Sequence, residues 1–321
     1  MTDVSVALCT YQGERFLAEQ LQSIARQDLL PVEVVVCDDR STDGTAEVVA
    51  QFAESAPFPV RFHVNESRLG VAANFSRGIS LCEGTVVALA DQDDVWVPAK
   101  LERLVAALDE RPTVGAAFSD AELVDGSLRP LGRTMFDVTR FTPRRRQRFV
   151  SGRGLEVLLA RNVVCGATLA FRSSLRKVLL PIPTTGLHDM WLSTLLCAVT
   201  EVAVVDEPLV RYRQHGANQV GAPATGLRSK LTRRRTQGVF GDELAHYRGM
   251  VARLASQPPG TVDPHTVEIL ERKVRHLEFR YGLSGHEPTA VITELVRGRY
   301  HRYSRGMESA GYDLLFRPRH G

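Results

Sequence analysis

The sequence predicts an α/β fold: a largely parallel sheet flanked by helices and followed by a helical C-terminal region. Two observations predict the sheet. Short apolar runs rich in β-branched residues alternate with segments of helical spacing, and no short hairpin turn joins consecutive runs. A third observation predicts the C-terminal region, because strand-like runs stop after Gly221 and charged, amphipathic helical patterns follow.

In the first hundred residues, strands and helices alternate. Apolar, β-branched runs predict strands at residues 4–9, 32–37, 60–64 and 85–90. Helical spacing and capping residues predict the helices between them, at residues 17–24, 45–54 and 70–80. Polar loops follow Cys9, Cys37 and Ala90, and ligands of such sheets bind beyond the carboxyl ends of the strands. We therefore expect these three loops to converge on one crevice.

Residues 101–221 are less regular. Apolar runs predict strands at residues 116–119, 166–171, 202–205 and 209–213. Helices are predicted at residues 155–159 and 191–199, and residues 140–148 are predicted to form a basic connector that contains a proline. The alanine-, proline- and glycine-rich segment 221–226 is typical of a linker.

Length and composition limit the class of protein. The chain has 321 residues, 44% hydrophobic and 24% charged, which is typical of a globular protein and excludes disorder of the whole chain. No run approaches the ~20 apolar residues of a membrane-spanning helix, and the chain starts with a strand-like run instead of a leader sequence. We therefore expect a cytoplasmic protein. Five widely spaced cysteines without a C-x-x-C pair predict buried free thiols.

Charge is distributed unevenly along the chain. The net charge of +3 is too small to predict a polyanionic partner, and we expect no nucleic acid partner. Two basic clusters occur, one formed by Arg144–Arg146 with Arg148 and the other within residues 228–235. They could contact anionic lipid headgroups or phosphates, as in peripheral attachment to the inner face of the plasma membrane. Solvated surface arginines are an equally good interpretation.

The tetrapeptide Asp91-Gln92-Asp93-Asp94 directly follows the fourth predicted strand. Three carboxylates this close repel each other unless solvent or a cation separates them. Closely spaced aspartate oxygens suit Mg²⁺ or Mn²⁺, which bridge protein carboxylates and substrate phosphates. An acidic surface turn is the alternative, but the position at the binding edge of the predicted sheet favours a metal site.

Three further polar motifs are candidates for a site. Asp38-Asp39 follows the second strand, where a carboxylate could accept the imide N–H of uracil or thymine, or simply belong to a helix-capping loop. Asp189 lies just before a predicted helix, where it could act as a general base or only cap that helix. His215 could ligate the same metal or contact a diphosphate, although a histidine beside glycine is more often a loop residue.

Taken in order, five motifs resemble glycosyltransferase family 2, and within it the bacterial rhamnosyltransferase-like branch. They are Cys9-Thr10-Tyr11-Gln12-Gly13-Glu14, Cys37-Asp38-Asp39-Arg40-Ser41-Thr42-Asp43-Gly44, Asp91-Gln92-Asp93-Asp94-Val95-Trp96, His188-Asp189-Met190-Trp191 and Tyr212-Arg213-Gln214-His215-Gly216. The resemblance implies a GT-A fold, a Rossmann-like fold with a mixed, mainly parallel sheet. It also implies a catalytic domain at residues 1–221, with a nucleotide-binding half at 1–100 and an acceptor-binding half at 101–221, before a helical region at 222–321.

The same resemblance implies roles for individual residues. The residues expected to bind the nucleotide-diphosphate sugar are Thr10, Tyr11, Glu14, Asp38, Asp39, Arg68, Asn74, Asp91 and Gln92. Either Asp38 or Asp39 would contact the base. The expected ligands of Mn²⁺ or Mg²⁺ are Asp91, Asp93 and His215, with Asp93 the more direct one. Asp189 would be the catalytic base, and Gly166 and Thr168 would shape the floor of the acceptor site.

One position departs from the family pattern. Many members carry arginine before the asparagine of the third helix, whereas Ala73 precedes Asn74 here. The arginine expected to contact the pyrophosphate is therefore missing, and Arg68 or Arg77 would have to supply that contact.

The implied reaction is inverting transfer of L-rhamnose from dTDP-L-rhamnose to a hydroxyl of a cell-surface polysaccharide or lipid-linked glycan. A UDP-hexose donor stays open, and the oligomeric state is not specified by the sequence. A nucleotidyltransferase would need a glycine-rich, lysine-containing loop after the first strand, and an oxidoreductase would need G-x-G-x-x-G there; both are missing. A non-catalytic glycan-binding or scaffold protein with a degenerate transferase fold is the remaining alternative. The intact acidic motifs, Asp189 and His215 argue against it.

Overall fold

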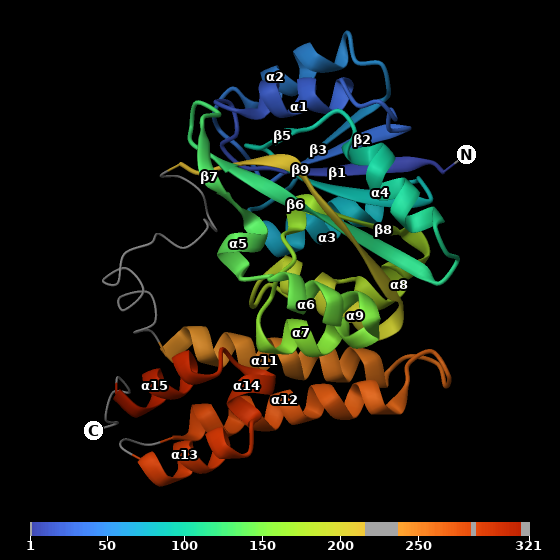
Figure 1. The fold of residues 1–321 in the computed structure, drawn as a ribbon. Helices are drawn as coiled ribbons and strands as arrows, with labels where there is room; N and C mark the ends of the chain where they lie inside the picture. Colours follow the sequence, from blue (N-terminus) through green and yellow to red (C-terminus); the bar gives the residue numbers. More distant parts are fainter. Residues whose placement is uncertain (1, 216–236, 284–286, 316–321) are drawn as a thin grey trace.

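The computed structural model describes residues 2–215, 237–283 and 287–315. At its centre, these residues form a nine-stranded mixed sheet in the order β3-β2-β1-β4-β8-β6-β9-β5, with β7 beside β6 (Figure 1). The strands are β1 Val4–Thr10, β2 Glu33–Asp38, β3 Val60–Val64, β4 Val86–Asp91, β5 Val95–Trp96, β6 Val114–Val124, β7 Pro130–Thr134, β8 Leu169–Arg172 and β9 Glu201–Arg213.

Helices cover both faces of the sheet. Those of the first 215 residues are α1 Leu17–Ala25, α2 Thr45–Ala53, α3 Val71–Leu81, α4 Lys100–Asp109, α5 Met135–Thr139, α6 Pro143–Arg148, α7 Gly154–Ala160, α8 Arg176–Leu179 and α9 His188–Val199. Shorter turns of other helix types are η1 Phe149–Arg153, η2 Gly166–Thr168 and η3 Ser173–Leu175. The C-terminal helices are α11 Gln237–Ala255, α12 Pro264–Gly282, α13 Pro288–Val296, α14 Arg299–Tyr303 and α15 Met307–Leu315.

Strand alternation divides the core into two layers. Successive side chains of a strand point to opposite faces, so Val6 and Leu8 pack with α1, α2 and α4, whereas Ala7 and Cys9 pack with α3, α7 and α9. On this second side α11 and α12 extend the same core, lying beneath α7 and α9 in Figure 1. The C-terminal helices are therefore joined to the sheet region by apolar packing.

The register of the parallel strands brings the polar loops together, as predicted. Strand β1 pairs with β2 on one side and β4 on the other, all parallel. Thr10 lies opposite Asp38, and Cys9 lies opposite Asp91. The loops that follow these three strands therefore leave the sheet at the same edge.

Several element predictions for residues 101–221 need correction. The basic connector contains helix α6, which Pro143 favours because a first-turn proline has no N–H that needs a helical partner. The strand predicted at 166–171 is instead the turn η2 followed by the short strand β8. The two strands predicted at 202–213 form one strand, β9, which shifts register against β6 near Pro208. Helix α9 starts earlier than predicted, at His188.

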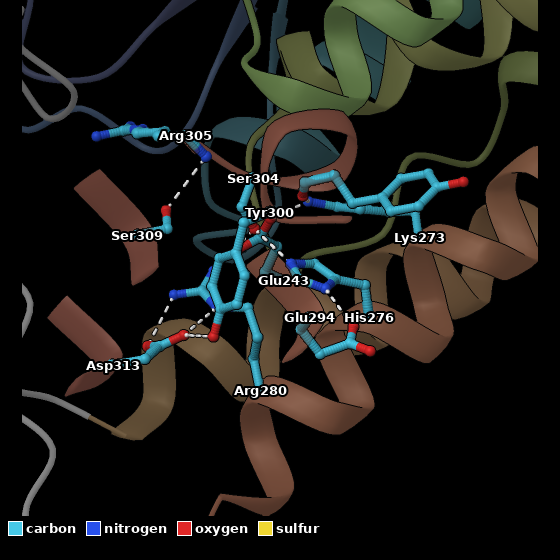
Figure 2. A network of polar contacts seen from close by, with 11 residues as sticks. Glu243, Lys273, His276, Arg280, Glu294, Tyr300, Ser304, Arg305, Ser309 and Asp313 are labelled. Carbon is cyan, nitrogen blue, oxygen red and sulfur yellow. Dashed lines mark hydrogen bonds and ion pairs between the residues drawn. The ribbon is translucent and has the colours of Figure 1, made fainter. Parts of the chain in front are cut away.

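Buried ionic contacts connect the C-terminal helices (Figure 2). The guanidinium of Arg280 donates to both carboxylate oxygens of Asp313, at 2.7 and 3.0 Å, and the Tyr300 hydroxyl donates to the same carboxylate at 2.8 Å. Lys273 donates to Glu243 at 2.9 Å. Because these partners come from α11, α12, α14 and α15, the contacts fix the helices relative to one another.

Two further predictions concern the cysteines and membrane-spanning helices. All five cysteines are free thiols; Cys9, Cys37 and Cys82 are buried, whereas Cys165 and Cys197 are only partly buried, which corrects the prediction for those two. In the part of the chain that the structure describes, no helix is long and apolar enough to cross a membrane. The basic cluster and linker of residues 221–235 lie outside the described residues.

Candidate active site

A cavity of about 390 Å³ opens at the carboxyl ends of β1, β2 and β4. Ten of the twelve predicted site residues line it: Thr10, Tyr11, Asp39, Arg68, Asn74, Asp91, Gln92, Asp93, Asp189 and His215. Glu14 and Asp38 are not among its lining residues, and of the two predicted floor residues only Gly166 lines it. Thr10 and His215, more than 200 positions apart in the chain, therefore share one cavity.

The two aspartates after β2 differ in their surroundings. The Asp38 carboxylate accepts from the hydroxyl of Thr10, at the end of β1, and from that of Ser41, at 2.7 and 2.6 Å. Asp39 lines the cavity, and its carboxylate accepts from the backbone N–H groups of Leu69 and Gly70, at 2.6 and 2.8 Å. Of the pair, only Asp39 lines the cavity.

Other predicted nucleotide-binding residues also shape the backbone around the cavity. Gln92 accepts from the Tyr11 N–H at 2.8 Å and donates to the Tyr11 carbonyl at 3.0 Å, which joins the loops after β4 and β1. Asn74 donates to the Cys37 carbonyl at 2.8 Å and accepts from Asn65 at 2.9 Å. Glu14 accepts from the backbone N–H of Gly44 at 3.1 Å.

Only one of the two arginines considered for the diphosphate faces the cavity. The Arg68 guanidinium lies 4.0 Å from the centre of the Tyr11 ring, and both residues line the cavity. Arg77 instead donates to the Val64 carbonyl at 3.2 Å and to Asn65, and it does not line the cavity. The cation–π contact holds the positive charge of Arg68 at the cavity wall.

The three carboxylates of the acidic tetrapeptide are crowded. Burial and the nearby charges of Asp93 and Asp189 raise the pKa of Asp91 to about 7. Burial, followed by the charges of Asp93 and Asp91, also raises the pKa of Asp94 well above its usual range. The Asp94 Oδ1 accepts from the Arg213 N–H at 3.0 Å, while its buried Oδ2 has no hydrogen-bond partner among the residues described.

Arg213 holds this cluster in place, although nothing in the sequence singles it out within its motif. Its buried guanidinium donates to the carbonyls of Asp93 and Gly126, both at 2.7 Å, and to Glu19 at 2.6 Å. Lys100 was also missed: its buried ammonium donates to the Ala167 carbonyl at 2.7 Å, within turn η2. Each residue is recognised as a buried cation near several carboxylates. This feature is visible only once the fold is known, so no sequence pattern identifies either residue.

The donor set fits a divalent cation. The Asp93 carboxylate lies 2.8 Å from His215 Nε2, and Asp91 lines the same cavity. Within the described ranges, no three His, Cys, Asp or Glu side chains are already placed as a closed metal site. Mg²⁺ and Mn²⁺ sites of this kind use one or two protein carboxylates and complete their coordination with substrate phosphates and water, so an open arrangement is the expected one.

Asp189 and His188 occupy the first turn of α9, and both line the cavity. Burial raises the pKa of Asp189 to about 6, although hydrogen bonds from the backbone, including Met190 N–H at 2.6 Å, oppose this. His188 stacks on Phe75 with ring centres 4.4 Å apart, and burial lowers its pKa to about 4. An added Cβ on Gly166 would lie 2.6 Å from His188 Nε2, so the absence of a side chain there gives the imidazole its room.

Helix α11 holds the segment that leads into this turn. The Arg253 guanidinium donates to the carbonyls of Val178, Leu180 and Pro181, at 3.2, 2.5 and 3.2 Å. The Trp191 indole N–H donates to the Leu179 carbonyl at 2.8 Å. The C-terminal helices therefore contact the elements that present Asp189.

Comparison with known proteins identifies the family. The pattern of glycosyl transferase family 2 matches residues 5–179, more than half of the chain. The chain belongs to this family. An uncharacterized glycosyltransferase of Nostoc sp. is 28% identical over 67% of this chain and 66% of its own length, so the chain spans just under two thirds of that relative. The dTDP-rhamnosyl transferase RfbG of Shigella flexneri is 25% identical, over 67% of this chain and 74% of that protein.

Solved structures show that this family 2 member has the GT-A fold. S. aureus TarS (residues 1–349) superposes with a TM-score of 0.58 at 18% identity, covering 98% of this chain and 83% of TarS. The mannosyltransferase PcManGT of Pyrobaculum calidifontis, solved with GDP-Man and Mn²⁺, gives a TM-score of 0.51 at 21% identity, covering 93% and 77%. The predicted fold class is confirmed.

Proposed function

We propose that this family 2 member is an inverting glycosyltransferase that moves a sugar from a nucleoside diphosphate to an acceptor hydroxyl. The observation that carries the proposal is a single cavity lined by Asp39, Arg68, residues 91–93 of the acidic tetrapeptide, His215 and Asp189. Asp39, Arg68, Asp93 and His215 are suited to a nucleotide and its diphosphate. Asp189 is a partly buried carboxylate suited to proton removal.

The donor would lie along the loops that follow β1, β2 and β4. Asp39 is proposed to contact the base, because Asp39 lines the cavity whereas Asp38 does not. Arg68 would contact the diphosphate, since a guanidinium presents its N–H groups in a fork that matches phosphate oxygens. These proposals assign roles to single side chains, which the family match alone does not do.

Asp91, Asp93 and His215 would hold a divalent cation, with Asp93 as the main ligand. Support comes from the 2.8 Å contact of Asp93 with His215 and from the crowding of three carboxylates, which a cation would relieve. When bound, such a cation supplies positive charge to the diphosphate as it leaves. Arg213 keeps the Asp93 backbone in position through its carbonyl.

Asp189 is proposed to take the proton from the acceptor hydroxyl as that oxygen attacks the anomeric carbon. The new C–O bond forms on the face opposite the diphosphate, whose C–O bond breaks, so the configuration inverts. A carboxylate with a pKa raised to about 6 is still ionised at neutral pH and is a stronger base than an ordinary aspartate. His188 and Gly166 would border the acceptor.

The donor sugar is proposed to be L-rhamnose carried by dTDP, with a cell-surface polysaccharide or lipid-linked glycan as acceptor. The match to RfbG favours this choice. TarS has been solved with UDP-GlcNAc, so UDP-sugars are the second candidate class. Peripheral membrane contact through the exposed Arg144 and Arg148 of α6 would suit a lipid-linked acceptor. Residues 1–221 would carry catalysis, and residues 222–321 would support the base through α11.

A thermal-shift screen with dTDP-rhamnose, UDP-glucose, UDP-GlcNAc and GDP-mannose, each with Mn²⁺, tests the donor assignment. A ligand at about 100 times its Kd adds about 2.7 kcal/mol to the stability of the native state, so the true donor should raise Tm clearly. Asp189→Asn should bind that donor as well as wild type but lose about 10²- to 10⁴-fold in sugar transfer. Near-normal sugar transfer by the Asp189→Asn variant would show that Asp189 is not the catalytic base.

A further inference from the structure

Lys100 is a buried cation at the first residue of α4. The residue is 0% exposed, so its ammonium is removed from water. A positive charge at a helix N-terminus is also disfavoured by the helix dipole. Other groups of the protein must therefore stabilise the charged form of Lys100.

Two groups contact the ammonium directly. The Lys100 Nζ donates to the Ala167 carbonyl in turn η2, at 2.7 Å, and lies 3.3 Å from the centre of the Trp96 ring. Both contacts favour a positive charge, but neither group carries a full negative charge. In the part of the chain that the structure describes, Lys100 forms no direct ion pair with a carboxylate. Its charge is therefore balanced at longer range.

The acidic tetrapeptide belongs to the same part of the core. Ala167 and Trp96, the two residues that contact the ammonium, pack in one apolar cluster with Ala90. Ala90 directly precedes Asp91 at the end of β4, and η2 packs against β4. Asp94 lies two residues before Trp96. The groups that contact the ammonium therefore lie in, or pack against, the segment that carries the Asp91 and Asp94 carboxylates.

The charges of Asp91 and Asp94 act on Lys100 through this interior. Burial lowers the pKa of Lys100 well below its usual range, whereas the charges of Asp94 and Asp91 raise it. Buried charges interact over longer distances than exposed charges, because little water screens them. The attraction also favours the carboxylates, since the buried Asp94 Oδ2 has no hydrogen-bond partner among the described residues.

We propose that Lys100 is a built-in counter-cation of the metal site. It balances part of the negative charge of Asp91 and Asp94 while no divalent cation is bound, and it opposes the binding of that cation. Mn²⁺ or Mg²⁺ alone would therefore bind weakly, and the donor diphosphate would supply the further negative charge that tight binding needs. The metal site is part of the proposed function, so this inference rests on it.

The test is calorimetric titration of MnCl₂ into the full-length protein without nucleotide. Lys100→Met removes the charge and keeps a long unbranched side chain, so the affinity for Mn²⁺ should rise about tenfold or more. Lys100→Gln should shift the affinity in the same direction while keeping an N–H donor for the Ala167 carbonyl. Damage to the fold would weaken Mn²⁺ binding, so a merely structural role for Lys100 cannot produce tighter binding.

Arg103 provides the matched control on the same helix. Its side chain is 55% exposed and lies 3.7 Å from the exposed Glu207. Arg103→Met also removes one positive charge from α4, but water and salt screen that charge. Its affinity for Mn²⁺ should therefore equal that of wild type. An Arg103→Met affinity that rises as much as that of Lys100→Met would overturn the proposal, because net charge alone would then explain the effect.

Thermal unfolding provides a second readout. MnCl₂ should raise the Tm of Lys100→Met by more than it raises the Tm of wild type, because tighter binding adds more to native stability. Equal Tm shifts, or Mn²⁺ affinities that are unchanged or weaker in both Lys100 variants, would overturn the proposal. Failure of the proposed function would appear separately, as nucleotide binding by wild type that does not depend on Mn²⁺.

Discussion

Asp189 sets the expected pH dependence of the reaction. Burial raises the pKa of its carboxyl to about 6, and the proposed mechanism needs the carboxylate form. Below that pKa the group is protonated and cannot accept the acceptor proton, so kcat/KM should fall about tenfold per pH unit there and level off above it. A pH profile of turnover between about pH 5 and 8 measures this. A flat profile across pH 6, at constant donor binding, would contradict the role of Asp189.

Single residues also show where sequence reasoning succeeds and where it stops. Asp39, Asp93 and Asp189 could be selected from the sequence because each follows a strand or begins a helix at a predictable edge. The choice between Asp38 and Asp39 depends on which of them lines the cavity, and this is visible only in three dimensions. Arg213 and Lys100 act through backbone carbonyls 67 or more residues away, which no local pattern encodes.

At the scale of elements, α11 should affect turnover, although none of its described side chains lines the cavity. Arg253→Ala removes three hydrogen bonds to the segment before α9 and should let Asp189 shift. Misplacement of a catalytic group by about 1 Å can cost up to about 10²-fold in rate, so we expect a 10- to 100-fold lower kcat with donor affinity nearly unchanged. Steady-state kinetics and donor titration measure the two quantities.

The matched control lies on the same helix. Arg248 pairs with Glu278 on the exposed surface, at 2.7 Å. Arg248→Ala should therefore leave kcat unaltered, since exposed ion pairs contribute little. Equal kcat values for the Arg253→Ala and Arg248→Ala variants would show that α11 does not position the base.

The elements that the sequence predicts correctly are those whose residue pattern is typical of one structure only. Strands β1, β2 and β4 are buried on both faces and appear as continuous β-branched runs, and α1 has an apolar stripe. The sequence predicts two strands where β9 runs, because Asp206, Glu207 and Pro208 have the composition of a turn. In the structure Asp206 and Glu207 lie in a register shift within β9, and pairing with β6 resumes at Pro208. The continuation of β9 along β6 therefore outweighs the turn-like composition of residues 206–208.

At the scale of the whole molecule, the apolar core shared by α7, α9, α11 and α12 predicts cooperative unfolding. We expect urea to unfold the sheet region and the C-terminal helices in one transition, despite the domain boundary predicted at residue 221. Arg280→Ala leaves the buried Asp313 carboxylate without its charged partner and should lower the free energy of unfolding by about 3–5 kcal/mol. Circular dichroism and tryptophan fluorescence should report the same midpoint.

Arg272 provides the control for this stability prediction. It lies on the same helix as Arg280 but pairs with the exposed Glu268. Arg272→Ala should leave the urea midpoint unchanged. Two separate transitions in the wild type, or an Arg280→Ala midpoint equal to that of wild type, would show that the C-terminal helices are a loosely attached unit.

Metal-dependent donor binding at Asp93 is the central claim, and calorimetric titration of dTDP or UDP into the purified protein tests it most directly. The account predicts binding with Mn²⁺ that weakens about tenfold or more when EDTA replaces Mn²⁺, or when Asp93→Ala replaces wild type, while Asp189→Asn binds like wild type. An Asp93→Ala variant that binds the nucleotide with wild-type affinity and the same dependence on Mn²⁺ would contradict it.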